Sequence, residues 1–504
     1  MALEDKDLRS IQEVRNLIES ANKAQKELAA MSQQQIDTIV KAIADAGYGA
    51  REKLAKMAHE ETGFGIWQDK VIKNVFASKH VYNYIKDMKT IGMLKEDNEK
   101  KVMEVAVPLG VVAGLIPSTN PTSTVIYKTL ISIKAGNSIV FSPHPNALKA
   151  ILETVRIISE AAEKAGCPKG AISCMTVPTI QGTDQLMKHK DTAVILATGG
   201  SAMVKAAYSS GTPAIGVGPG NGPAFIERSA NIPRAVKHIL DSKTFDNGTI
   251  CASEQSVVVE RVNKEAVIAE FRKQGAHFLS DAEAVQLGKF ILRPNGSMNP
   301  AIVGKSVQHI ANLAGLTVPA DARVLIAEET KVGAKIPYSR EKLAPILAFY
   351  TAETWQEACE LSMDILYHEG AGHTLIIHSE DKEIIREFAL KKPVSRLLVN
   401  TPGALGGIGA TTNLVPALTL GCGAVGGSSS SDNIGPENLF NIRRIATGVL
   451  ELEDIRKEEN QATSELPVDA DALIQSLVEK VLAELKIKNK TLIGGILKWQ
   501  TQTH

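Results

Sequence analysis

The sequence predicts an α/β protein with a doubly wound parallel sheet, and two observations lead to this prediction. After residue 101, short apolar runs alternate with amphipathic segments, as where SIVFSP is followed by ALKAILETVRIISEAAEKAG. Such alternation is typical of βαβ units, whose parallel strands are covered by crossover helices. The chain also has 504 residues. This is too many for one hydrophobic core, so we expect two or three domains.

The chain is expected to begin with helices. Three segments carry apolar residues at helical spacing: 8–28, 33–49 and 51–63. The expected order then becomes a β-rich stretch (101–119), a helix (121–136), a strand (137–143), a helix (147–166), a strand (193–200), a helix (201–211) and a glycine-rich turn that runs into a strand (213–227). A second α/β series is expected to follow from 254 to 403.

The composition changes towards the C-terminus. Residues 451–467 are polar and charged without periodicity, which indicates a linker. Residues 468–489 then predict a strongly amphipathic helix. Its apolar positions are Leu473, Ile474, Leu477, Val478, Val481, Leu482 and Leu485. We make no structural prediction for residues 491–504.

Composition and charge exclude several classes of function. Lys+Arg and Asp+Glu both number 56, so net charge gives no reason to expect a nucleic acid or an anionic membrane as partner. No apolar run has the length of a membrane span, and the first twenty residues are not a signal peptide. The cysteines are dispersed and odd in number, which argues for a reducing compartment and against disulfides or a metal site. They are Cys167, Cys174, Cys251, Cys359 and Cys422. We therefore expect a cytoplasmic protein.

Two glycine-rich turns are candidates for holding a dinucleotide phosphate. Gly199 and Gly200 end one predicted strand, and Gly216, Gly218 and Gly220 end another. Free backbone N–H groups at the start of a helix suit a phosphate. Neither turn has the GxGxxG spacing with an acidic residue about twenty positions on. Tight turns in a packed sheet remain the alternative interpretation.

Cys251 is the candidate nucleophile among the five cysteines. It follows the turn Asp246-Asn247-Gly248 and leads into a strand, where a thiolate can be exposed on a rigid element. The other four lie at a helix end, in apolar segments or between glycines. Free cysteines are more often inert and buried, and this is the alternative for Cys251 as well.

Two further residues could assist a nucleophile. Asn120, followed by Pro121, stands at the end of a predicted βα turn, where its amide could stabilise an oxyanion. The alternative is a plain turn asparagine. His373 follows Gly370 and Gly372 before a predicted strand, so it has room to act as a general base. The alternative is a structural histidine.

Taken together, these segments resemble the aldehyde dehydrogenase superfamily, and more closely its CoA-acylating branch, the aldehyde dehydrogenase half of bifunctional aldehyde–alcohol dehydrogenases. The resemblance is distributed from about residue 10 to 450. The segments that carry it are 60–74 (EETGFGIWQDKVIKN), 108–124 (PLGVVAGLIPSTNPTST), 136–145, 197–207, 216–227, 245–256 (FDNGTICASEQS), 341–347 (EKLAPIL), 370–374 (GAGHT) and 418–439.

The resemblance implies a role for each candidate. Cys251 corresponds to the nucleophile, Asn120 to the oxyanion donor, and His373 to a histidine used around thioester formation. Glu341 corresponds to the acid that holds the nicotinamide ribose. The remaining cofactor-binding positions that the resemblance implies are Ile116, Pro117, Ser118, Thr119, Ser142, Pro143, His144, Gly199, Gly200 and Gly218.

Two departures from the wider family carry information. Hydrolytic members have a glutamate in an ELGGKSP-like turn, whereas the turn here, GVGPGNGP (216–223), contains no carboxylate. Without that base water is not activated, so a thiol such as coenzyme A is expected to release the acyl group. The family's Lys-Pro-x-Glu segment is here Ser142-Pro143-His144, which leaves NAD against NADP open, although the branch favours NAD. We expect no iron-dependent alcohol dehydrogenase domain after the linker, and no metal.

We therefore expect an NAD-dependent, CoA-acylating and reversible oxidation of acetaldehyde or propionaldehyde to the acyl-CoA. The alternatives are a CoA-acylating succinic semialdehyde dehydrogenase, a hydrolytic aldehyde dehydrogenase, an acyl-phosphate reductase and a non-catalytic scaffold. The expected fold has a Rossmann-like cofactor domain (1–227), an α/β catalytic domain (228–435) and a small β oligomerisation extension.

The expected extension combines a hairpin (91–107) with a final strand (436–450), which would exchange between subunits of a homodimer or homotetramer. The helix at 468–489 resembles encapsulation peptides, which dock enzymes to shell proteins of bacterial microcompartments by laying an apolar face into a groove. An ordinary subunit-contact helix is the alternative.

Overall fold

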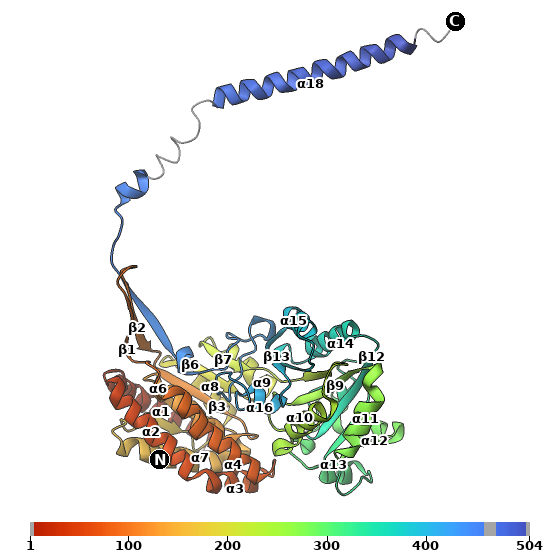
Figure 1. Ribbon diagram of the computed structural model, residues 1–504. Coiled ribbons are helices and arrows are strands. Elements are labelled where there is room, and N and C mark those ends of the chain that lie inside the picture. Colours follow the sequence, from red (N-terminus) through yellow and green to blue (C-terminus); the bar gives the residue numbers. More distant parts are fainter. Residues whose placement is uncertain (1–4, 458–469, 500–504) are drawn as a thin grey trace. The chain divides into compact units, whose positions relative to one another are not determined.

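The computed structural model describes residues 5–457 and 470–499 (Figure 1). It divides into two compact units, the first Met1–Lys95 with Glu104–Arg443, and the second Glu96–Met103 with Arg444–His504. Both large sheets of the protein, and all candidate site residues, belong to the first unit.

The helical start of the chain is confirmed. Helix α1 (Lys6–Ala29) begins at Asp5, whose side chain accepts a hydrogen bond from the Leu8 N–H group. Helix α2 (Gln33–Gly49) begins with a reciprocal capping box between Ser32 and Gln35. The next helical elements are α3 (Arg51–Thr62), α4 (Trp67–Val75), a π-helical turn η1 (Phe76–His80) and α5 (Val81–Ile85).

The first sheet has five parallel strands in the order β5-β4-β3-β6-β7. Their bounds are β3 (Val111–Ile116), β4 (Ser138–Pro143), β5 (Ile172–Cys174), β6 (Thr192–Thr198) and β7 (Ala214–Val217). The connecting helices are α6 (Pro121–Lys134), α7 (Leu148–Lys164), α8 (Ile180–Lys188) and α9 (Ser201–Tyr208). The predicted parallel βαβ units are therefore confirmed.

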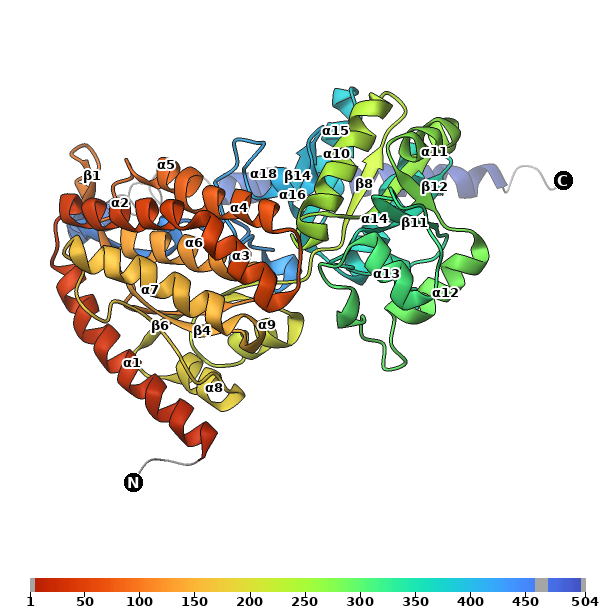
Figure 2. The same cartoon turned by 90° about the horizontal axis from the view of Figure 1, so that it is seen from below.

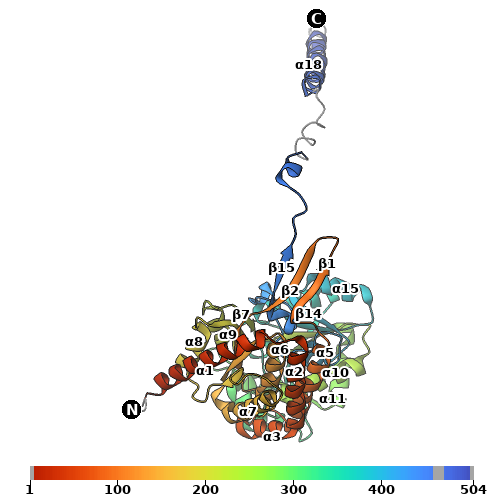
Figure 3. The same cartoon turned by 90° about the vertical axis from the view of Figure 1, so that its left-hand side faces the viewer.

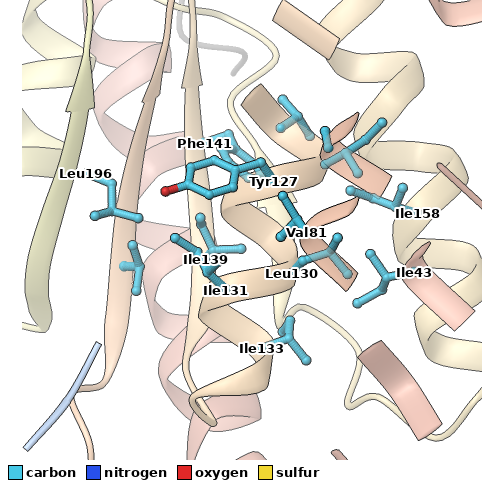
Figure 4. Close-up of a cluster of buried hydrophobic side chains, with 14 of the residues drawn as sticks. Ile43, Val81, Tyr127, Leu130, Ile131, Ile133, Ile139, Phe141, Ile158 and Leu196 are labelled. Atoms are coloured by element: carbon cyan, nitrogen blue, oxygen red, sulfur yellow. The ribbon is translucent and has the colours of Figure 1, made fainter. Parts of the chain in front are cut away.

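Helices cover both faces of this sheet. On one face, α2, α6 and α7 lie side by side (Figure 2). Their apolar residues, among them Ile43, Leu130 and Ile158, pack with Ile139, Phe141 and Leu196 of the strands (Figure 4). On the other face, α1, α8 and α9 pack on the alternate strand residues (Figure 3). A strand buried on both faces reads as a continuous apolar run, which explains VVAGLI and SIVFSP.

The second sheet has seven parallel strands in the order β10-β11-β12-β9-β8-β13-β14. Their bounds are β8 (Gly222–Ile226), β9 (Glu254–Glu260), β10 (Ala276–Phe278), β11 (Val324–Glu328), β12 (Ile346–Ala352), β13 (Gly372–His378) and β14 (Val394–Val399). The main helices around it are α10 (Ile232–Thr244), α11 (Lys264–Lys273), α12 (Asp281–Ile291), α13 (Val307–Ala314), α14 (Trp355–His368), α15 (Lys382–Lys391) and α16 (Gly403–Gly407).

The change from the first sheet to the second occurs between β7 and β8. Strand β8 pairs with β9 and β13, so it belongs to the second sheet, although the expected cofactor domain extended to residue 227. The turn 218–221 connects the two sheets. Its glycines thus lie where the two α/β layers meet, which is also where the candidate site is built.

The remaining strands form a three-stranded sheet in the order β1-β2-β15 among the described residues. Its members are β1 (Gly92–Asp97), β2 (Val102–Pro108) and β15 (Phe440–Ala446). Every residue of β15 after Phe440 is exposed.

The C-terminal helix α18 spans Ala470–Trp499, ten residues beyond the expected end at 489. Residues 452–457 of the expected linker form a short helix, and 458–469 lie outside the described residues. The seven apolar side chains on the predicted apolar face of α18 are each 50–67% exposed. Within the described ranges, no helix is long and apolar enough to cross a membrane.

Candidate active site

The loop that carries Cys251 has a strained and well-anchored backbone. It follows α10, and Asp246 (φ 49°) and Asn247 (φ 52°) are both left-handed, a conformation that Asp and Asn tolerate better than most residues. The buried Asp246 carboxylate accepts hydrogen bonds from the Ile66 N–H group (2.7 Å) and the Lys70 ammonium (2.9 Å). The loop is therefore fixed by residues next to and within α4.

The close approach at this anchor explains a glycine. A Cβ atom at Gly65 would lie 1.8 Å from the Asp246 Oδ1 atom, and the backbone there has φ +70°. Both facts require glycine at position 65. This position lies in the segment GFGIW, which carried part of the family resemblance.

Cys251 and His373 are in contact. The Cys251 Sγ atom lies 3.3 Å from Nε2 of His373, and Nδ1 of His373 lies 2.9 Å from the Thr374 hydroxyl. His373 stands near the start of β13 and is fully buried, whereas Cys251 is half-buried. The cysteine thus separates the imidazole from solvent.

Burial keeps both members of this pair neutral in the resting site. Burial, with a smaller contribution from the nearby Glu341 carboxylate, raises the pKa of the Cys251 thiol to about 12. Burial lowers the pKa of His373 to about 3, assisted by the Arg396 guanidinium. Both shifts disfavour a thiolate–imidazolium pair. Any transfer of the thiol proton to Nε2 of His373, which is in contact with the sulfur, must therefore accompany bond formation to the substrate.

Asn120 is turned towards the same loop. Its Nδ2 group donates to the Thr249 carbonyl oxygen and to the Thr119 hydroxyl, each at 3.2 Å. Its Oδ1 atom accepts from the Lys73 ammonium at 2.6 Å. Asn120 stands at the N-terminus of α6, but its side chain makes no capping bond there. The amide N–H groups therefore face the loop that carries Cys251 and the neighbouring Thr119.

A cavity of about 570 Å³ collects most of the predicted site residues. Those that line it are Pro117, Ser118, Thr119, Asn120, His144, Gly199, Gly200, Gly218, Cys251 and Glu341. Its size is within the range of small-molecule and cofactor sites. The termini of β3, β6 and β7 supply one wall, and the 297–303 and 340–343 loops supply the other.

Four of the predicted site residues lie outside the lining. Ile116 is buried in the core beside the sheet, and Pro143 ends the buried strand β4. Ser142 is buried with its hydroxyl 2.7 Å from that of Thr183. His373 is fully buried and contacts Cys251, which lines the cavity. Ile116, Ser142 and Pro143 therefore support the wall by packing, without offering a polar group to the cavity.

The carboxylate-free turn approaches the nucleophile directly. A Cβ atom at Gly220 would lie 1.8 Å from the Cys251 carbonyl oxygen. The Gly220 N–H group donates to Glu341 Oε1 at 2.9 Å, and burial raises the pKa of Glu341 to about 8. The turn 216–223, which contains no carboxylate, therefore lies directly beside Cys251.

Several residues of the site were missed from the sequence. Glu369 lines the cavity, accepts from the Glu341 N–H group (3.0 Å) and pairs with Arg340 (3.2 Å). Ser297, Met298, Ile302 and Val303 line the opposite wall from a loop that matched no motif. A usable signal did exist for Lys70 and Lys73, because two lysines three residues apart share one helix face.

The chain matches a known protein family over most of its length. The family described as "Aldehyde dehydrogenase family" matches residues 7–404. The bifunctional aldehyde-alcohol dehydrogenase AdhE of Escherichia coli K12 is 47% identical over 442 residues, which cover 87% of this chain and 50% of that protein. The chain thus spans about half the length of this curated relative.

Two solved structures are similar over nearly their whole length. The acetylating aldehyde dehydrogenase from Geobacillus thermoglucosidasius is 55% identical with a TM-score of 0.88, over 89% of this chain and 99% of that one. The propionaldehyde dehydrogenase from the Clostridium phytofermentans fucose utilisation bacterial microcompartment is 28% identical with a TM-score of 0.78, over 87% and 98%.

Proposed function

This chain belongs to the aldehyde dehydrogenase family, and from that premise we propose that it catalyses the NAD-dependent, CoA-acylating oxidation of a short-chain aldehyde. The observation that carries the proposal is the contact between Cys251 and His373 at the wall of a cavity that also holds Asn120. The acetylating Geobacillus enzyme, 55% identical, supports the acylating branch.

The residues present fit a dinucleotide. Gly199 and Gly200 precede the N-terminus of α9, where backbone N–H groups favour an anionic phosphate. An added Cβ atom would meet nothing within 4 Å at Gly200, and at Gly218 only the Gly426 carbonyl oxygen at 3.9 Å, so these backbones are open to a ligand. When bound, NAD supplies the hydride acceptor for the oxidation. Glu341, Thr119 and His144 would hold it from the cavity wall.

The chain's own residues carry the acyl transfer. The Cys251 sulfur forms a bond to the aldehyde carbon, and its proton passes to Nε2 of His373. The Asn120 amide N–H group stabilises the oxyanion that develops on the carbonyl oxygen. Loss of hydride from this adduct leaves a thioester on Cys251. The thiol of coenzyme A then loses its proton to solvent and attacks the thioester, and the Cys251 sulfur leaves as the acyl-CoA forms and regains its proton from His373.

The missing carboxylate explains why a thiol and not water completes the reaction. The turn that approaches Cys251 most closely offers Gly220 and no acidic side chain. Glu341 is held by the Gly220 N–H group, and with its pKa raised to about 8 it is mostly protonated near neutral pH. This turn therefore offers water no carboxylate base beside Cys251, whereas a thiol needs less activation.

The arginine and the lysine that line the cavity, Arg340 and Lys342, are already bound to other partners. We therefore propose that the substrate is an uncharged aldehyde, acetaldehyde or propionaldehyde. Arg340 is paired with Glu369, and the Lys342 ammonium donates to the carbonyl oxygens of Tyr338 and Arg340, both at 2.6 Å. Neither cation is available for a substrate carboxylate. This observation argues against succinic semialdehyde.

The proposed activity is tested by measuring NADH formation from acetaldehyde and from propionaldehyde, with and without CoA, for the wild type and for Cys251→Ala. We expect sustained turnover only for the wild type with CoA. Sustained turnover by the alanine variant would refute the nucleophile. A comparison of kcat/KM for NAD and NADP in the same assay tests the preference for NAD.

We propose two associations beyond the substrates. Strand β15 is the edge of its three-stranded sheet and is exposed, so it can pair with a second copy in a homodimer or homotetramer. Light scattering on the purified protein tests this, and a monomer that is fully active would contradict it.

The second association concerns the apolar face of α18. Its exposed side chains at four-residue spacing suit a helix that lies in a groove of a microcompartment shell protein, inside a compartment in the cytoplasm. The similarity to a microcompartment propionaldehyde dehydrogenase supports this proposal. A reporter fused to residues 467–489 should bring down shell protein, and failure to do so would favour a subunit-contact helix.

A further inference from the structure

We propose that Lys73 is a positioning residue that fixes the orientation of the Asn120 amide, so that its N–H group and not its oxygen faces the reacting carbonyl at Cys251. This inference rests on the proposed function. It is carried by the 2.6 Å contact between the Lys73 ammonium and Oδ1 of Asn120.

The chemistry of the two partners decides which way the amide points. An ammonium has three donors and no acceptor, so the Asn120 atom that faces Lys73 must be the oxygen. The opposite side of the amide then presents Nδ2 to the Thr249 carbonyl oxygen at 3.2 Å. A flipped amide would set N–H against ammonium and oxygen against carbonyl oxygen. Both contacts of the flipped state are repulsive, so Lys73 and Thr249 select one orientation.

Without Lys73, the Thr249 carbonyl oxygen would be the one remaining described partner that favours this orientation. The asparagine makes no capping bond to α6, and its other partner, the Thr119 hydroxyl, can donate or accept. An amide in the wrong orientation would turn a lone pair towards the oxyanion that forms in the reaction. The transition state would then be destabilised by the group that is meant to stabilise it.

Lys73 is itself held in place on the same loop as the nucleophile. Its ammonium donates to Asp246 Oδ2 at 2.5 Å and to the Thr249 hydroxyl at 2.9 Å. The side chain is 3% exposed. The anchor of the Cys251 loop and the anchor of the Asn120 amide are therefore one buried group, which couples the positions of nucleophile and oxyanion donor.

The charge balance of this cluster indicates that Lys73 has more than a structural role. Asp246 is already paired with Lys70, which is 4% exposed, from the same face of α4. A second buried lysine on one carboxylate adds a desolvation cost that a structural anchor does not need. Asp69 also faces the cluster and accepts from the Asp246 N–H group. Of the two lysines, only Lys73 contacts Asn120, and Lys70 instead reaches the Thr119 carbonyl oxygen (3.2 Å).

The test is a double-mutant cycle on the acylation step, read as single-turnover NADH formation without CoA. Asn120→Ala should slow this step about 10²–10³-fold, as for loss of one oxyanion donor. Lys73→Met should slow it about 10²-fold. The double variant should be within about threefold of Asn120→Ala, because Lys73 acts only through the amide. A double variant whose loss of acylation rate equals the product of the two single losses would overturn the inference.

Two further variants separate orientation from loss of structure. Lys73→Gln keeps an N–H donor for Oδ1 without the charge, and should recover about tenfold of the rate lost in Lys73→Met. Equal rates for the two would contradict an orienting role. Lys70→Met is the matched control, since it removes the other cation on Asp246. It should lower thermal stability as much as Lys73→Met, yet slow acylation at least about tenfold less than Lys73→Met does.

The outcomes also separate this inference from the proposed function. A wild type that forms no NADH from any short aldehyde would refute the function. An active wild type with an additive cycle, or with Lys70→Met as slow as Lys73→Met, would refute only the role of Lys73. If Lys73→Met does not fold, the cycle between Lys73→Gln and Asn120→Ala gives the same decision.

Discussion

The Sγ atom of Cys251 lies 3.3 Å from Nε2 of His373, and the sulfur stands between the cavity and the fully buried imidazole. The histidine can therefore exchange a proton with the cysteine without contacting the aldehyde. Because both groups are neutral at rest, the site does not store a thiolate and must generate it during attack.

The first prediction concerns the pH dependence of thiol reactivity. With the Cys251 pKa raised to about 12, the thiolate fraction should rise about tenfold per pH unit between about pH 7 and pH 9. Alkylation of the cofactor-free enzyme by iodoacetamide, followed by mass spectrometry, should show this slope without a plateau. The Cys251→Ala variant is the control for the four buried cysteines. A plateau already at about pH 8 would contradict a raised pKa.

The second prediction separates catalysis from packing at His373. His373→Ala should slow acylation about 10²–10⁴-fold, as expected for loss of a general base. His378 provides a matched control, since it is buried on the same strand and its ring nitrogens have no hydrogen-bond partner among the described residues. His378→Ala should reduce stability but not the acylation rate per folded molecule. Equal losses of rate in both variants would argue for a structural His373.

The third prediction concerns the turn beside the nucleophile. Gly220→Ala should force the turn and the Cys251 backbone apart, because the new Cβ atom would lie 1.8 Å from the Cys251 carbonyl oxygen. We expect loss of activity and destabilisation by about 2–4 kcal/mol. Gly49→Ala, where nothing lies within 4 Å of the Cβ position, should change stability by less than about 1 kcal/mol. Chemical denaturation and steady-state rates measure both, and a fully active Gly220→Ala enzyme would refute the close approach.

Some of the features behind these predictions could be inferred from the sequence, and others could not. Helix periodicity and capping residues were sufficient for α1 and α2, and alternating strands and helices were sufficient for the parallel sheets. Cys251 was singled out by its turn, and the structure places it in the cavity wall. Local patterns determine local structure, so these parts could be predicted.

Other features depend on partners far apart in the chain. Lys73 and Asp246 are 173 positions apart, and nothing in either segment alone shows that they pair. The apolar run of β8 indicates a buried strand, but it does not show which of the two parallel sheets the strand joins. The expected domain boundary was therefore placed after β8, at residue 227. Likewise, GAGHT does not show that His373 lies behind the sulfur and not in the cavity.

The fourth prediction concerns acid stability. Burial alone would raise the pKa of Asp246, but attraction to Lys73 and Lys70 outweighs it, so the pKa is lowered overall. A carboxyl group with a lowered folded-state pKa contributes stability above its unfolded pKa of about 4, and this contribution is lost as pH falls through the folded value.

Asp246→Asn should therefore cost about 3–5 kcal/mol near neutral pH, because it leaves buried lysines without their partner. Its free energy of unfolding should also fall less than that of the wild type as the pH is lowered below about 4. Urea denaturation at a series of pH values checks both statements. An identical acid dependence in the two proteins would show that Asp246 is not the titrating group.

The central claim is that the acyl group passes from Cys251 to a thiol and not to water, and rapid mixing of enzyme, NAD and acetaldehyde without CoA tests it most directly. We predict a burst of about one NADH per Cys251, followed by a steady rate at least about 10²-fold below the rate with CoA. Steady turnover at the same rate with and without CoA would contradict the claim.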